Sequence, residues 1–145
     1  PEGAEQRELP ARIFAASALD GARRKVRKGG RDLAELDDEA RHTVRKDAKK
    51  LRYAAEFFSS LFTGKRAKRR QKRFLAALEE LQEKLGALND LVVARDVLAR
   101  AGLETEAAPS RPVAPDKEKD KEKKALIEAA ADAHDALADA KPFWR

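Results

Sequence analysis

The helical spacing of apolar residues in the middle of the chain limits the fold most strongly. At about 100° per residue, the apolar side chains of this stretch fall on one face of a helix. They are Val44, Ala48, Leu51, Ala55, Phe58 and Phe62. Asp37-Asp38-Glu39 come just before them, where capping and the helix dipole favour carboxylates. We therefore expect a helix from these acids to about Phe62, ended by Gly64.

The rest of the chain also indicates helices and no strands. Pro10 suits the first turn of a helix, and Gly29-Gly30 can end it. Three more helices are expected, over residues 10–31, about 65–102 and about 119–140. The short first connections predict an all-α fold, an up-and-down four-helix bundle.

The domain boundaries follow from the same pattern. We expect one helical bundle domain over residues 10–145, preceded by a disordered or extended lead-in over residues 1–9. The prolines and alternating charges of residues 103–118 indicate a flexible loop inside this domain. Gln82 and Asn89, seven residues apart, are interpreted first as hydrogen-bonding groups within the bundle.

Composition excludes several kinds of chemistry. The 145 residues include no cysteine and two histidines, so there is no disulfide, thiolate metal site or cysteine nucleophile, and no metal is expected. No Walker-type or GxGxxG motif and no catalytic carboxylate set is present, which predicts a non-enzymatic protein without cofactor. No apolar run approaches about 18 residues, so we expect no membrane contact and a cytoplasmic location. The absence of methionine suggests a piece of a longer protein.

The net charge of +6 conceals an uneven distribution. Residues 41–73 hold 13 basic and two acidic side chains, a net charge of +11. Many of the basic residues repeat at i,i+4 spacing, for example Arg45–Lys49 and Arg66–Arg70, where like charges destabilise a helix by roughly 0.2–0.5 kcal/mol per pair. A bound polyanion would turn this repulsion into attraction, so the segment indicates a polyanion-binding surface.

Two strings within and after this segment resemble the CHAD domain, the conserved histidine α-helical domain. They are HTVRKDAKKLRYAAEFF (His42–Phe58) and LQEKLGALND (Leu81–Asp90). The family pattern H-x-x-R-K-x-x-K-x-L-R-Y is matched by His42, Arg45, Lys46, Lys49, Leu51, Arg52 and Tyr53. The terminal PFWR resembles the end of many such domains. Full-length members resemble two four-helix units with two copies of the histidine motif, and this chain, with one copy, resembles the C-terminal half of such a double bundle.

The resemblance implies binding of inorganic polyphosphate by basic side chains in a central groove, and an association with polyphosphate granules. It also implies pairing of two copies, or pairing with the other half of the domain. In some proteins the domain is fused to a triphosphatase, so an accessory domain that delivers substrate to such an enzyme is an alternative.

We expect the basic residues of two antiparallel neighbouring helices to line one groove. Arginine offers bidentate forks to phosphate and lysine offers mobile point charges. The central contacts are expected from Arg45, Lys46, Lys49 and Arg52, with His42 and Tyr53 donating at the margins. The groove is expected to extend over Lys50, Arg66, Arg69, Arg70 and Arg73.

The choice between polyanions depends on aromatic residues. Nucleic-acid binders add stacking rings or base-reading groups to a basic face. Only Tyr53 is aromatic on this face, whereas Phe57, Phe58, Phe62 and Phe74 are interpreted as core. Polyphosphate is therefore favoured, and nonspecific binding to a nucleic-acid backbone remains an alternative.

Overall fold

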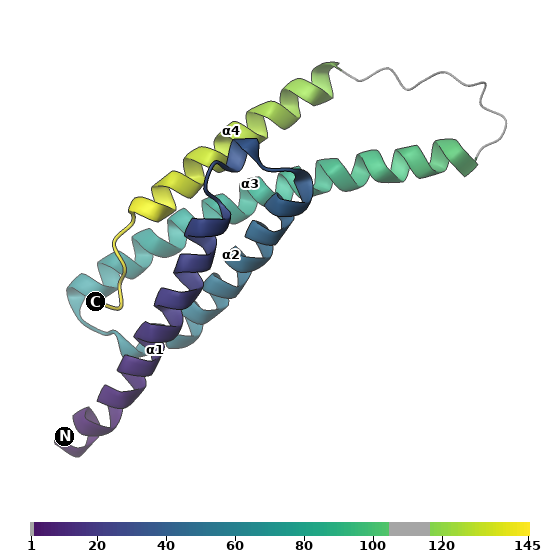
Figure 1. Cartoon of the computed structure of the whole chain (residues 1–145). Helices are drawn as coiled ribbons and strands as arrows, with labels where there is room; N and C mark the ends of the chain where they lie inside the picture. The colour runs from purple at the N-terminus through teal and green to yellow at the C-terminus, as the bar shows by residue number, and fades with distance from the viewer. Residues whose placement is uncertain (1, 105–116) are drawn as a thin grey trace.

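The computed structural model describes residues 2–104 and 117–145, and this part of the chain is helical and contains no strand (Figure 1). The four helices are α1 (Glu2–Gly29), α2 (Asp38–Phe58), α3 (Lys65–Glu104) and α4 (Lys117–Asp139). Two 3-10 turns, Leu33–Glu35 and Ser59–Leu61, follow α1 and α2. The expected all-α helical bundle is confirmed.

The helix boundaries differ from the expected ones at three places. Helix α1 begins at Glu2, so the expected lead-in over residues 1–9 is wrong from residue 2 onward, and Pro10 lies inside the helix. Residues 4–9 contain mainly good helix formers, which extend the helix past the proline. Helix α2 ends at Phe58, and a 3-10 turn follows where the helix was expected to continue. Residues 103, 104, 117 and 118 of the expected loop are helical, and the rest of that loop lies outside the described residues.

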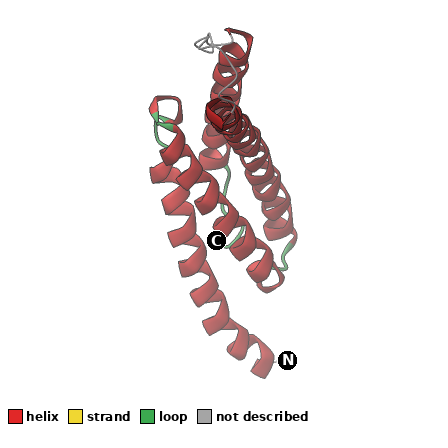
Figure 2. Cartoon of the chain, turned by 90° about the vertical axis from the view of Figure 1, so that its right-hand side faces the viewer, coloured by secondary structure: helices red, strands yellow, loops and turns green. Residues whose placement is uncertain are grey.

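The four helices form two antiparallel pairs, α1 with α2 and α3 with α4. Figure 2 shows the α1–α2 pair on one side of the molecule and the α3–α4 pair on the other. Helix α2 also packs along α3, and α1 is tied to the end of α4 by Arg23, which donates to the carbonyl oxygens of Ala138 (3.1 Å) and Ala140 (2.9 Å).

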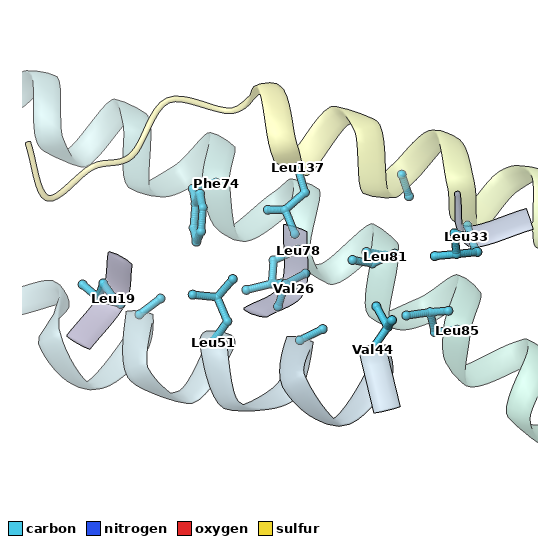
Figure 3. Packing of buried hydrophobic residues seen from close by; sticks show 14 of the residues in the cluster. Leu19, Val26, Leu33, Val44, Leu51, Phe74, Leu78, Leu81, Leu85 and Leu137 are labelled. Atoms are coloured by element: carbon cyan, nitrogen blue, oxygen red, sulfur yellow. The ribbon is translucent and has the colours of Figure 1, made fainter. Parts of the chain in front are cut away.

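The core fills the space between the two pairs (Figure 3). Val44, Ala48, Leu51 and Ala55 of α2 are buried there, as their spacing predicts. They meet the α3 stripe of Phe74, Leu78, Leu81, Leu85 and Leu88. The C-terminal segment folds back to close one end, where Phe143 and Trp144 pack edge-on against Phe74 with ring centroids 5.9 and 5.3 Å apart.

A close contact between α1 and α4 fixes the corner that leads into α2. The ring of His134 is buried, and its Nε2 lies 2.9 Å from the carbonyl oxygen of Val26. A Cβ atom on Gly30 would clash with the same Nε2. Glycine is therefore required at residue 30 by space. His134, for which the sequence indicates no function, supports the fold.

Candidate polyanion-binding surface

The first turn of α2 uses its charged residues to build the corner. The carboxylate of Asp37 caps the helix by accepting a hydrogen bond from the amide of Ala40 (2.7 Å). Arg41 is buried and donates to the carbonyl oxygens of Leu33 and Leu36, and the carbonyl oxygen of Leu33 also accepts from the amide of Leu36 at 3.2 Å. It also pairs with Asp38 at 2.7 Å. Arg41 therefore supports the fold.

Asp38 links the same corner to α4. Its carboxylate lies 3.1 Å from Lys123 Nζ, in addition to its bond with Arg41. Partial burial alone would raise the pKa of Asp38, but the hydrogen bonds from Arg41 and Lys123 outweigh it and hold the pKa below its ordinary value.

The middle of α2 carries basic residues of a different kind. Lys46, Lys49 and Lys50 are exposed and Arg45 is half-buried. None of these four side chains forms a hydrogen bond or ion pair with any residue that the structure describes. We call this set the α2 cationic face. Its charges are available to a ligand without the loss of any internal contact.

Arg52 lies on the same helix but is already engaged. Its Nε donates to Glu56 at 3.0 Å and its Nη1 to Gln82 of α3 at 3.3 Å. The hydrogen bond with Glu56 raises the pKa of Arg52 above its ordinary value. Gln82 thus acts as a hydrogen-bonding group between helices, as expected from the sequence. A phosphate that reached Arg52 would have to share it with Glu56.

His42 lies at the seam between α2 and α3. Its ring borders a cavity of about 30 Å³ that Arg41, Leu88 and Asn89 also line. Its Nδ1 is buried and has no hydrogen-bond partner among the described residues. His42 precedes Arg45 and Lys46 by three and four residues, so the ring shares a side of α2 with the cationic face.

The basic residues of α3 lie elsewhere. An open cleft of about 510 Å³ separates the start of α3 from the end of α4. We call it the α3–α4 arginine cleft; it is lined by Arg66, Arg69, Arg70, Arg73, Asp139, Ala140 and Lys141. Arg70 also donates to the carbonyl oxygen of Arg145 at 3.3 Å.

This cleft lies on the side of α3 that faces away from α2, so it is separate from the α2 cationic face. Arg73 and Gln82 are nine residues apart, which is about 180° around a helix, and Gln82 is the residue that contacts α2. The expectation of one continuous groove is therefore wrong. The core stripe of α3 fixes the rotation of the helix, and with that rotation its arginines point toward α4.

Two aromatic rings are exposed on α2. Tyr53 is 64% exposed, and Phe57, which the sequence analysis places in the core, is 79% exposed. The interpretation of Phe57 as core is wrong because the adjacent Phe58 packs against the core instead. Phe74 is buried as expected, and Phe62 packs partly against the core.

Comparisons with known proteins show the family to which the chain belongs. A sequence model of the CHAD domain matches residues 1–99, which include both strings noted above and end before α4. Comparisons with curated proteins and with solved structures yield no match. None of the described helices is long and apolar enough to cross a bilayer. No group of three or more potential metal ligands lies within residues 2–104 and 117–145. The family match covers more than half of the chain, which therefore belongs to the CHAD-domain family.

Proposed function

We propose that this chain binds inorganic polyphosphate through the α2 cationic face and does so without catalysis. CHAD domains in general are known to bind polyphosphate. The observation that carries the proposal here is the set of four neighbouring cations, Arg45, Lys46, Lys49 and Lys50, that have no internal partner among the described residues.

The charge pattern of α2 favours an anionic ligand physically. Arg45–Lys49 and Lys46–Lys50 are like-charge i,i+4 pairs, each destabilising by roughly 0.2–0.5 kcal/mol. A chain of phosphates along the helix would remove this repulsion and add charge-assisted hydrogen bonds. Because polyphosphate presents the same group at every unit, it needs repeated donors along a surface and no shaped pocket, which suits an exposed helix face.

The remaining candidate residues have secondary roles in this proposal. His42 contacts the phosphate chain at one margin of the α2 cationic face and Tyr53 at the other. Arg52 contributes while it stays bound to Gln82. The α3–α4 arginine cleft binds phosphate separately, and its contribution is smaller because Asp139 lies among its cations and Arg70 is already bound to the carbonyl oxygen of Arg145.

Two variants of equal charge test this assignment. One replaces the four residues of the α2 cationic face with glutamine, and the matched control replaces Arg66, Arg69, Arg70 and Arg73 with glutamine. At roughly 0.5–1 kcal/mol for each exposed charge contact, the first variant should bind long-chain polyphosphate about 30- to 1,000-fold more weakly. The control should lose less than about tenfold. Equal losses would show that only total charge matters and would contradict the assignment.

The absence of catalysis is tested separately. The chain is incubated with polyphosphate and Mg²⁺, and free phosphate is measured over time. We expect no release above the rate without protein. Phosphate release that depends on the chain would overturn this part of the proposal and leave the binding assignment intact.

A further inference from the structure

The α2 cationic face continues into the two exposed aromatic rings. At about 100° per residue, Lys46, Lys50, Tyr53 and Phe57 fall within an arc of roughly 60° on α2. They follow one another along the helix over about 16 Å, at 1.5 Å per residue. All four are exposed, so cations and rings form one stripe on the surface.

The rings are open for stacking. Phe57 packs against Phe58 at 5.1 Å between ring centroids in an edge-to-face arrangement, and 79% of Phe57 remains exposed. Phe58 in turn packs against Phe14 of α1, with ring centroids 6.2 Å apart, so the ring that Phe57 contacts is itself held between two helices. Tyr53 precedes Phe57 by one helical turn, so each ring can meet a different base.

A polymer of phosphate alone makes no use of such rings. A membrane surface is also a poor fit, because the apolar face of α2 is buried in the bundle core and cannot enter a bilayer. In a nucleic-acid duplex the flat faces of the bases are already stacked. A single strand presents phosphates at regular spacing together with free base faces, which is the combination that lysines next to aromatic rings bind.

We propose that this stripe binds single-stranded nucleic acid without sequence preference. Lys46 and Lys50 contact the phosphates, and Tyr53 and Phe57 stack on bases. Glu56, the acidic residue nearest the rings along α2, is already paired with Arg52 at 3.0 Å. The strand shares its cations and the Tyr53 hydroxyl with the proposed polyphosphate site, so the two ligands compete, but Phe57 acts only on the strand.

The test compares three polyanions by fluorescence anisotropy at one salt concentration. They are an oligothymidine of about 12 nucleotides, within the usual range of site sizes, an abasic strand of the same length, and polyphosphate of similar charge. Replacing either ring by leucine should weaken oligothymidine binding about 5- to 150-fold, the value of one stacked base. The Phe57→Leu variant should bind polyphosphate and the abasic strand within about twofold of the wild type.

A matched control is Val97→Ala, which changes an exposed apolar residue of α3 and should leave all three affinities unchanged. Oligothymidine binding that survives both ring substitutions, or an abasic strand that binds as tightly as oligothymidine, would overturn the proposal. If Phe57→Leu abolished binding to anionic phospholipid vesicles and kept oligothymidine binding, the stripe would be a membrane contact and the proposal would be overturned. A wild-type chain that binds oligothymidine but not polyphosphate would instead contradict the proposed function and leave this proposal intact.

Discussion

The first turn of α2 and its middle use basic residues for opposite purposes. Arg41 and Arg45 lie one helical turn apart, but only Arg41 is next to the corner at residues 33–36, whose carbonyl oxygens it binds. Arg45 and the lysines that follow it lie beyond that corner and keep their charge unpaired within the described structure. Whether a basic residue supports the fold or remains free for a ligand therefore depends on nearby backbone groups, and residue type alone does not decide it.

The largest effect on stability should come from replacing Arg41 and Arg45 by methionine, each in a separate variant. Arg41→Met removes a donor from the carbonyl oxygens of Leu33 and Leu36 and from the carboxylate of Asp38, which should lower the free energy of unfolding by about 2–4 kcal/mol. Arg45→Met, the matched control, should change it by less than about 0.5 kcal/mol. Urea unfolding followed by circular dichroism measures both. Comparable destabilisation by the two substitutions would contradict the distinction between them.

Polyphosphate binding should show the reverse order for the same two variants. Arg45→Met removes a proposed contact and should weaken binding several-fold. The folded fraction of Arg41→Met should bind as the wild type does, because Arg41 is turned into the corner. Isothermal titration below the unfolding temperature of each variant checks this, and weaker binding by the folded Arg41 variant would break the comparison.

The corner itself can be tested through its glycine. Gly30→Ala brings a Cβ against the ring of His134, which should cost about 1–3 kcal/mol through overpacking. Gly21→Ala is the control, since a Cβ there meets no atom within 4 Å. Inside a helix this change should stabilise by about 0.5–1 kcal/mol. If Gly30→Ala were also stabilising, the close approach of α1 and α4 would be wrong.

The smallest effect should appear in how the free energy of unfolding depends on pH. Hydrogen bonds from Arg41 and Lys123 hold the pKa of Asp38 below its ordinary value despite partial burial, which acts the other way. Its contribution to stability is therefore complete above the unfolded pKa near 4 and is lost as the pH falls through the lower folded pKa. Asp38→Asn should reduce this acid-dependent loss by less than about 1 kcal/mol, since the carboxylate is partly exposed. Unfolding free energies measured from pH 7 downward should therefore converge for wild type and variant; parallel curves would contradict the linkage.

Periodicity alone predicts much of this molecule. The buried stripe of α2 follows from its 3.6-residue spacing, and the all-helical fold follows from four such segments. Spacing also predicts which way the α3 arginines point. Arg73 and Gln82 are about 180° apart around the helix, so Arg73 faces away from α2 when Gln82 faces it. Antiparallel contact alone predicts a single groove, and the rotation of α3 about its axis gives two separate surfaces instead. The exposure of Phe57 also follows from spacing, because Phe58 shares the apolar face of α2 with Val44 and Leu51 whereas Phe57 lies about 100° from Phe58 and off that face.

Other features could not be predicted from spacing. Arg41 has the same local pattern as Arg45, and only the path of residues 30–37 distinguishes them. The start of α1 depends on whether the helix tolerates Pro10, which its flanking helix formers decide.

The salt dependence of polyphosphate affinity tests the central claim most directly. If the α2 cationic face binds the phosphate chain, the logarithm of the affinity should fall linearly with the logarithm of salt concentration. Removing its four cations should make that slope shallower by about three, at 0.7–0.9 per phosphate contact as for nucleic acids. The equally charged variant of the α3–α4 arginine cleft should keep most of the wild-type slope. A slope that the α2 substitutions leave unchanged would contradict the account.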